Sequence, residues 1–477
     1  MQSWIRVTLI LCAFGTLREL RPSEPFVSEF LSGPWRNVTE EQLNRDVYPI
    51  GTYSYLAQLV VVFLVTDFLR FKPVIIVSGI SGIAVYAVLL WTRSLEWLQV
   101  SQFLYGMYMA TEVAYFTYIY AQVDSSKYPR VSSYTRVAAL VGRFISGVSS
   151  QLLVHFHLMD YRDLNYITFT GKFAHNFIYI FFLQFYIYLL SLRQFTATQK
   201  SSLMSLTSVR LPIPCLNSNN RLCYKISAQI LATFWAFWLP PVLHGIYFHR
   251  RISASGKEVP LQSKSLRSNV TSAVALIASH TRTAYTRGRV LAWSALYAVA
   301  LAYYVQLQSN MQLLWRLKQA DVVYNGAAEA ATTLLGACGA LASQRASNAM
   351  LPAVATLIQG ISLFITTHIE NMFVSYAGYI VVGMLFHYTI TLASAKIACQ
   401  LADESCFGLI FGINTLIGTL VQTIIILILI QTLSLSIYSQ FYAISFMYIL
   451  LAIMWLAGWL IYKCRQKESI VNTSNQY

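Results

Sequence analysis

Long apolar segments recur along the chain, separated by short polar stretches. Each covers roughly 20 residues, the length that a helix needs to cross the hydrocarbon core of a bilayer. Six precede a long polar interval and six follow it, near residues 4–20, 50–68, 73–92, 97–122, 132–157 and 172–192, then 290–312, 323–342, 349–367, 372–395, 405–432 and 437–462. The pattern predicts twelve membrane-spanning helices in two sets of six.

These segments divide the chain into four regions. We expect an N-terminal six-helix bundle over 1–193, a basic central loop over 194–289, a C-terminal six-helix bundle over 290–462 and a tail over 463–477. The chain is 56% hydrophobic and 11% charged, with a mean hydropathy of +0.53, whereas about a quarter of a soluble domain is charged. This composition excludes a soluble enzyme, a disordered chain and a fibrous protein. It predicts an all-α polytopic protein in contact with a lipid bilayer.

The net charge of +15 is concentrated in the central interval. The segment from Arg193 to Arg289 contains 4 Lys and 9 Arg against one acid, Glu258, so it supplies +12 of the total. Nucleic-acid binding would explain such a region, but cytoplasmic loops of membrane proteins carry the same excess of Lys and Arg. We therefore expect a cytoplasmic loop without a nucleic-acid partner. The sequence indicates no obligate protein partner.

Charges in the short loops predict the orientation in the membrane. Basic residues lie between the second and third segments and between the fourth and fifth, at Arg70, Lys72, Lys127 and Arg130. The interval 23–46 is acidic instead and contains the sequon Asn37-Val38-Thr39. We expect this interval outside the cell, with Asn37 glycosylated. Both termini then lie in the cytoplasm of a multi-pass protein of the plasma membrane.

One further apolar segment, 226–248, does not fit this scheme as a thirteenth span. It contains Pro240-Pro241 and has basic residues on both flanks, whereas a membrane span normally shows a charge difference between its ends. We expect an interfacial or protein-packed segment. A thirteenth span would also place the basic tail outside the cell.

A carboxylate in the middle of the fourth segment is the main candidate for substrate recognition, because a mid-membrane charge costs about 2.5–3.5 kcal/mol. Glu112 lies on one helical face with Tyr105, Tyr108 and Tyr115. An acid between tyrosines suits a flat aromatic cation, since the rings add cation–π attraction of about 0.5–2 kcal/mol each. The alternative is a structural ion pair between Glu112 and Arg143 of the fifth segment.

Three polar residues of the second half are further candidates. Glu329 is a second intramembrane acid, with coupling, gating and a buried hydrogen bond as open alternatives. Asn414 and Gln422 would make neutral polar contacts with a solute or a neighbouring helix. The sequence contains no Walker loop, HExxH, paired CxxC or GxSxG nucleophile. We therefore expect no enzymatic activity, catalytic residue, cofactor or metal.

Several motifs spread over the chain carry a family resemblance. They include Arg21-Pro22-Ser23-Glu24-Pro25-Phe26, Tyr53-Ser54-Tyr55-Leu56, Glu112-Val113-Ala114-Tyr115, Tyr128-Pro129-Arg130-Val131-Ser132, Tyr324-Asn325-Gly326-Ala327-Ala328-Glu329-Ala330 and Phe411-Gly412-Ile413-Asn414-Thr415. In these motifs the chain resembles the reduced folate carrier / thiamine transporter family. The resemblance implies a major-facilitator fold, with two six-helix bundles that move a vitamin by alternating access. It also implies Glu24 and Tyr48 as substrate contacts.

The resemblance further predicts the charge of the substrate. Folate carriers have cationic residues at the positions of Glu112, Gln422 and Gly383, where this chain resembles thiamine transporters or has no side chain. Coulomb attraction then favours a cation such as thiamine. Gly51 and Arg143 depart from the thiamine branch, because Gly51 replaces a Trp and Arg143 an apolar or aromatic residue. A folate-like carrier, a diverged member without folate transport, and a non-transporting membrane receptor or sensor remain alternatives.

Overall fold

The computed structural model describes residues 3–69, 71–115, 118, 128–170, 239, 250–252, 258–260, 266–318, 323–343, 345, 349–401 and 407–474. The predicted sixth span, 172–192, lies outside the described residues. So does segment 226–248 except for Leu239, which is 1% exposed and packs in an apolar cluster with Val7 and Phe71. Within the described part of the chain, eight helices are long and apolar enough to cross a membrane.

The long helices of the first half follow the predicted segments closely. They are α1 (Ser3–Glu19), α4 (Tyr48–Phe68), α5 (Lys72–Trp91), α6 (Leu95–Ala110) and α8 (Tyr128–His155). Thr111 interrupts the fourth span after α6, and residues 112–115 are helical again. Short elements connect the spans: a 3-10 turn at Glu24–Phe26, α2 (Val27–Ser32), α3 (Glu40–Gln42), a π-helix at Leu43–Val47, and α9 (Tyr161–Thr170).

The second half contains a helix at each of its six predicted segments. They are α13 (Gly288–Lys318), α14 (Asn325–Ser343), α15 (Leu351–His368), α16 (Met372–Ala398), α17 (Phe407–Ile426), which continues as a π-helix to Thr432, and α18 (Ile437–Ser474). Local signals set several of these ends. The Asn371 side chain, for example, accepts hydrogen bonds from two amides of the first turn of α16, which otherwise lack partners.

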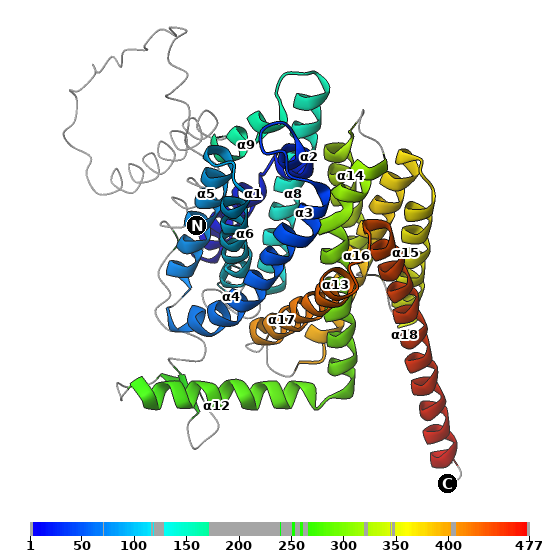
Figure 1. Cartoon of the computed structure of the whole chain (residues 1–477). Coiled ribbons are helices and arrows are strands. Elements are labelled where there is room, and N and C mark those ends of the chain that lie inside the picture. The colour runs from blue at the N-terminus through cyan, green and yellow to red at the C-terminus, as the bar shows by residue number, and fades with distance from the viewer. Residues whose placement is uncertain are drawn as a thin grey trace, which may run out of the picture.

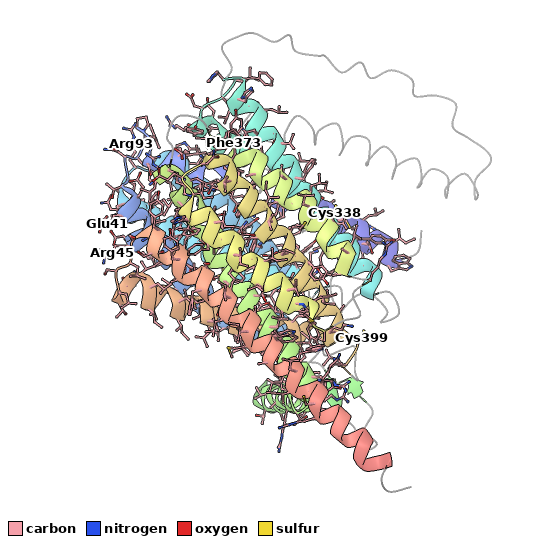
Figure 2. All side chains as sticks on the ribbon, turned by 90° about the vertical axis from the view of Figure 1, so that its right-hand side faces the viewer. Glu41, Arg45, Arg93, Cys338, Phe373 and Cys399 are labelled. Carbon is pink, nitrogen blue, oxygen red and sulfur yellow. The ribbon has the colours of Figure 1, made fainter. Side chains whose placement is uncertain are left out.

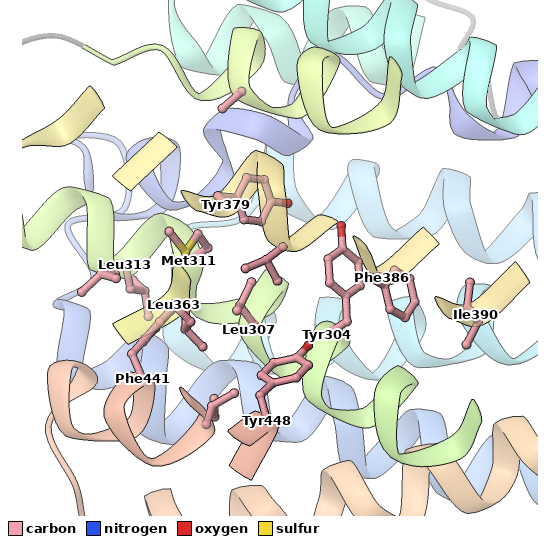
Figure 3. Close-up of a cluster of buried hydrophobic side chains, with 14 of the residues drawn as sticks. Tyr304, Leu307, Met311, Leu313, Leu363, Tyr379, Phe386, Ile390, Phe441 and Tyr448 are labelled. Atoms are coloured by element: carbon pink, nitrogen blue, oxygen red, sulfur yellow. The ribbon is translucent and has the colours of Figure 1, made fainter. Parts of the chain in front are cut away.

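Aromatic side chains fill the interior of the second half (Figure 3). Tyr304 of α13 stacks on Phe386 of α16, with ring centroids 3.9 Å apart and planes 7° from parallel. Trp315, farther along α13, packs edge-on against Tyr379 of α16. The outward faces of the same helices carry exposed apolar side chains, such as Phe373 of α16 at 70% and Leu291 of α13 at 52%. This inside-out pattern is expected of helices surrounded by lipid.

The two halves lie side by side in Figure 1 and meet through close helix packing. Helix α8 packs on α14, and α4 packs on α17. At the first contact, a Cβ on Gly147 would lie 2.6 Å from the carbonyl oxygen of Gly326, so the backbones approach too closely for any side chain. Small residues at helix crossings permit such contacts in membranes.

The central region contains a helix that the sequence analysis did not predict. Helix α12 (Leu266–Tyr285) lies across one end of the bundle, roughly perpendicular to the spans (Figure 1). Its Leu276 is buried against Phe63 of α4 and Leu409 of α17, so α12 contacts both halves. A two-stranded hairpin precedes it, with β1 (Arg250–Ile252) antiparallel to β2 (Glu258–Pro260). The end of the bundle at which α12 lies is called the α12 end below, and the opposite end, where α2 and α3 lie, the α2 end.

Candidate functional site

The end of the first helix carries a cluster of charged side chains inside the N-terminal half. Arg18 and Glu19 of α1 and Arg21 just beyond it are each 2–3% exposed, although most residues of α1 are apolar. Glu19 accepts from three guanidinium groups: Arg18 Nη1 at 3.0 Å, Arg21 Nη2 at 2.8 Å and Arg143 Nε at 2.6 Å. A buried carboxylate is tolerated only when it is paired in this way.

Glu112 joins this cluster through Arg18, not through Arg143. Its Oε1 lies 3.3 Å from Arg18 Nη1, and its side chain is 24% exposed. The predicted alternative of a Glu112–Arg143 pair is therefore corrected, because Arg143 instead hydrogen-bonds to Glu19. Glu112, which follows the break at Thr111, pairs with Arg18 at the end of α1. Arg143 extends from α8 to Glu19, the next residue of α1.

The tyrosines predicted to share a face with Glu112 do so, and that face packs on the first helix and the residues that follow it. Tyr105 donates to Glu24 Oε1 at 3.1 Å, Tyr108 to the carbonyl of Arg18 at 3.0 Å, and Tyr115 to the carbonyl of Leu11 at 2.9 Å. The Arg18 guanidinium also lies over the Tyr108 ring, 4.3 Å from its centroid. Tyr108 and Tyr115 are 2–3% exposed. These two side chains are therefore buried against the backbone of α1 and hold that helix in place.

Three carboxylates remain accessible around this cluster. Glu24 is 41% exposed and pairs with Arg21 at 2.9 Å. Glu329, on α14 of the other half, accepts a hydrogen bond from Tyr379 at 2.8 Å and interacts electrostatically with both Glu24 and Arg143. Together with Glu112, these acids come from both halves of the molecule and are the predicted residues that the structure brings together.

The predicted amides lie elsewhere. Asn414 is fully buried and accepts a hydrogen bond from Tyr285 of α12 at 2.7 Å, so it anchors that helix. Burial raises the pKa of Tyr285 to about 12, which keeps its hydroxyl a donor. Gln422 is 3% exposed and donates to Gln306 at 3.4 Å, in the packing between α17 and α13.

Tyr48 lies at the start of α4, toward the α2 end. Its hydroxyl is 2.9 Å from that of Ser28. It lines a small cavity between α4, α13 and α17, whose other lining residues are Pro49, Thr52, Gln306, Ser309, Asn310, Ile426 and Ile430. Gly51, one turn farther along, faces α6, where an added Cβ would lie 2.7 Å from the Gln102 side-chain oxygen. The flexible end of Gln102 occupies the space into which a larger side chain would grow.

Gly383, one of the three positions at which the resemblance implies a cationic residue in folate carriers, has no space for a side chain. A Cβ on Gly383 of α16 would lie 2.2 Å from Thr332 Cγ2 of α14 and 3.3 Å from the Tyr304 hydroxyl. Thr332 is itself 2% exposed. An arginine at this position therefore requires α14 and α16 to separate.

A second set of polar contacts joins the halves at the α2 end. Arg316, near the end of α13, pairs with Glu29 of α2 at 3.0 Å and Glu40 of α3 at 2.7 Å. Gln312 donates to the Glu24 carbonyl at 2.8 Å and accepts from the Ser28 amide at 3.1 Å. Burial raises the pKa of the Glu29 carboxyl above its usual range, although Arg316 opposes this effect.

Figure 2 shows other charged residues of this end, including Glu41, Arg45 and Arg93. Asn37 lies in the same region, with an exposed side chain and a positive φ of 52°, a conformation that Asn tolerates better than most residues. It remains a predicted glycosylation site. Among the described residues, no group of three or more His, Cys, Asp or Glu side chains could hold a metal ion.

The sequence analysis missed Arg18 and Glu19, and it did not assign a role to Arg21. The signal was present, because Arg18 and Glu19 fall inside the predicted first span, 4–20, where intramembrane charges indicate function. Both stand at the end of that span, where long charged side chains often extend to the interface. Only the packing of α1 against α6 and α8 shows that they are buried.

Comparison with known proteins agrees with this architecture. The model of the family described as reduced folate carrier matches residues 2–196 and 220–443. Thiamine transporter 2 of Macaca fascicularis is 34% identical over 424 residues, which cover 87% of this chain and 81% of the relative. Thiamine transporter 1 of Homo sapiens is 31% identical over 99% of this chain and 94% of its own length. The human reduced folate transporter is 29% identical over 96% of this chain and 72% of its own.

Solved structures share the fold at low sequence identity. A POT family transporter in complex with a thioalcohol-conjugated peptide has a TM-score of 0.59 at 10% identity, covering 94% of this chain and 95% of that one. The POT family transporter PepTSo has a TM-score of 0.56 at 13% identity, covering 96% and 98%. At these identities the likeness concerns the fold alone.

Proposed function

We propose that this chain, which belongs to the reduced folate carrier family, carries thiamine or a related cationic aromatic vitamin across the plasma membrane by alternating access. Its fold is of the major-facilitator type, and the relatives of known name are vitamin transporters. Both halves contribute acids to the candidate site, which is the arrangement needed when a solute is to be released by separating them.

The charge of the cluster carries the proposal. Glu19, Glu24, Glu112 and Glu329 stand against Arg18, Arg21 and Arg143, so one negative charge is in excess when all are ionised. Glu19 is buried, while the other three acids are accessible. A solute with one positive charge would balance this excess.

A folate dianion is disfavoured by the same charges. Two like charges 4 Å apart repel by about 4 kcal/mol at an effective dielectric constant of 20. Gln422 is a neutral amide, and Gly383 has no room for a cationic side chain. The relatives named as folate transporters keep folate as the alternative substrate.

The orientation belongs to the proposal as well. We place the α2 end outside the cell, because it carries the acidic interval and the Asn37 sequon, and the α12 end in the cytoplasm, because it carries the basic central region. Arg316 and its two carboxylates then close the outer side of the bundle between the halves.

Uptake by cells that lack their own vitamin carriers tests the function. Labelled thiamine, folate and pyridoxine are supplied to cells expressing the wild type, Glu112→Gln or Glu41→Gln. We expect thiamine uptake that falls about tenfold or more in Glu112→Gln at equal surface expression. Glu41, which is 76% exposed and pairs only with Arg45 among the described residues, serves as the control and should leave uptake unchanged.

The other outcomes are equally informative. Folate uptake without thiamine uptake would favour the folate alternative, and pyridoxine uptake alone would identify a different cationic or neutral aromatic vitamin. Surface-expressed protein that moves none of the three solutes would contradict transport of these vitamins and favour a receptor or sensor.

A further inference from the structure

A group of basic side chains surrounds the corner at which α12 ends and α13 begins (Figure 1). Arg282 lies in the last turn of α12, and Arg287 and Arg289 stand at the start of α13. The end of α18 adds Lys463 and Arg465. All five side chains are exposed, and no ion pair among the described residues involves any of them. We call these five residues the basic corner.

Direct contacts bring the end of α18 against the start of α13. Arg289 Nη2 donates to the Tyr462 hydroxyl at 2.6 Å, and the Arg289 guanidinium lies 5.3 Å from the centroid of the Tyr462 ring. On the next residue, Lys463 Nζ lies 4.4 Å from the centroid of the Trp459 ring. Positive charges from distant parts of the sequence are therefore held near one another by aromatic side chains.

The same residues mark the edge of the apolar surface. Exposed apolar side chains follow α18 as far as Ile461, which is 56% exposed, and on α13 they begin at Leu291, which is 52% exposed. Tyr462 lies at this edge, and Trp and Tyr side chains gather at the level of the lipid headgroups. Arg289 and Lys463 therefore lie at the same level, beside the polar ends of lipid molecules.

The charge of this region is strongly one-sided. The segments 280–289 and 462–468 together contain six Lys or Arg and one acid, Glu468. A loop that only sets the orientation of the chain needs the excess of positive charge, but no fixed arrangement of it. Here aromatic contacts already hold two of the cations in place, which lowers the entropy that they lose when an anion binds.

Arg289 and Lys463 offer complementary chemistry to phosphate groups. Among the described residues, Arg289 uses a single nitrogen for Tyr462, so the other N–H groups of its planar guanidinium remain available for bidentate binding of a phosphate. Lys463 adds a compact charge with three donors. Arg282, Arg287 and Arg465 extend the positive field around this pair.

We infer that the basic corner binds the headgroup of a phosphorylated inositol lipid. Several phosphates on one ring concentrate negative charge as the basic corner concentrates positive charge, and about four to eight Lys and Arg beside the cytoplasmic end of a membrane helix are typical of such binding. Anionic lipids of this kind lie in the cytoplasmic leaflet, where the proposed orientation places the α12 end. The inference rests on that orientation and not on the identity of the solute. Lipid bound here would also hold the end of α12, the helix that contacts both halves.

A fluorescent dioctanoyl phosphatidylinositol bisphosphate tests the inference by its binding to the purified full-length protein in detergent, with the signal of empty micelles subtracted. The competitors are unlabelled inositol lipid, phosphatidylserine at matched total charge, and inositol trisphosphate, which is the free headgroup. We expect the inositol lipid to compete about tenfold better than either of the others. Phosphatidylserine spreads its charge over separate molecules, and the free headgroup lacks acyl chains that reach the apolar surface of α18.

Paired variants locate the site. Arg289→Gln combined with Lys463→Gln should weaken binding of the inositol lipid about thirtyfold, since each basic residue near a lipid surface contributes about fivefold. Arg289→Lys combined with Lys463→Arg keeps both charges and should stay within about threefold of wild type. Arg93→Gln is the matched control, because Arg93 also lies over an aromatic ring, that of Trp35 at 3.8 Å, but at the α2 end. It should leave binding unchanged.

Three results would overturn the inference. Equal competition by phosphatidylserine would show general attraction of charge, equal competition by the free headgroup would show a site for soluble phosphates, and unchanged affinity in the Gln pair would place the binding elsewhere. If the Gln pair does not fold, Arg465→Gln on the exposed end of α18 replaces it, with an expected loss of about fivefold. Vitamin uptake does not enter this measurement, so its failure leaves the proposed function standing, and failure of uptake leaves the lipid site standing.

Discussion

At the scale of single residues, Glu19 is the centre on which the candidate site depends. It is 3% exposed and touches three guanidinium groups, from two positions in its own segment and one on α8. Its removal would leave buried cations without their shared counterion, whereas removal of any one arginine leaves Glu19 with two others. The cluster is therefore asymmetric in its sensitivity to substitution.

We predict that Glu19→Gln destabilises the protein by about 3–5 kcal/mol, the cost of leaving buried charge unpaired. Arg143→Gln should cost clearly less, and combining the two should recover part of the Glu19→Gln loss. Thermal unfolding of the purified variants measures all three effects. Strictly additive losses in the double variant would contradict a coupled cluster.

Gly383 offers a second test at the scale of single residues, because a single methyl group, Cγ2 of Thr332, occupies the space beside it. We predict that Gly383→Ala costs about 1–3 kcal/mol, since the new Cβ would meet Thr332 Cγ2. Thr332→Ser removes that methyl group and keeps the hydroxyl that donates to the Ala328 carbonyl at 2.7 Å. The double variant should regain the loss in thermal unfolding, and a failure to do so would mean that the contact does not limit this position.

At the scale of elements, the sequence predicts where the described membrane-spanning helices lie along the chain, but not which helices pack against one another. Helix α16 was expected over 372–395 and is found over Met372–Ala398, because apolar length and the Asn371 cap are local signals. Helix α12 was missed because its small Ala, Ser and Thr residues give little hydropathy contrast. Its position depends on Leu276 packing between α4 and α17.

The same limit applies to the candidate site. Periodicity placed Tyr105, Tyr108, Glu112 and Tyr115 on one face, and the structure confirms that face. Periodicity alone does not show which helix packs on that face. The partner of Glu112 is Arg18, at the C-terminal end of α1. Asn414 was read as a solute contact because nothing in the sequence indicates that Tyr285 will reach it.

The contact of α13 with α2 and α3 predicts how the α2 end opens, the end that we propose to lie outside the cell. We expect Arg316→Gln to raise the rate at which a cysteine at position 28 reacts with a membrane-impermeant maleimide on intact cells. Ser28 is fully buried and its amide donates to Gln312, so the site is reached only when the halves separate. Breaking two ion pairs, each partly buried, favours that separation.

Arg93→Gln is the matched control for this experiment, because its contact with Trp35 lies within the first half. Labelling of the native cysteines in the parent protein is subtracted. Unchanged reactivity at position 28 in Arg316→Gln would contradict a closing role for this ion-pair group.

At the scale of the whole molecule, the orientation can be tested directly. We predict that epitopes at both termini and within 249–290 are accessible only after cells are permeabilised, because the positive charges lie at these segments. Glycosidase treatment should increase the gel mobility of wild type and not of Asn37→Gln. Antibody labelling of the C-terminus on intact cells would contradict the predicted orientation.

The ion pair between Glu19 and Arg143 also has a consequence for biosynthesis. The two residues are 124 positions apart, so Glu19 leaves the ribosome long before its partner is made. At a synthesis rate of about 5–20 residues per second, that interval lasts roughly 6–25 seconds. Arg18 and Arg21 are made almost at once and shield Glu19 meanwhile, yet Arg18 itself waits for Glu112. We therefore expect the first helix to complete its packing only after the fifth span is made, and substitutions at Arg143 to prolong that interval.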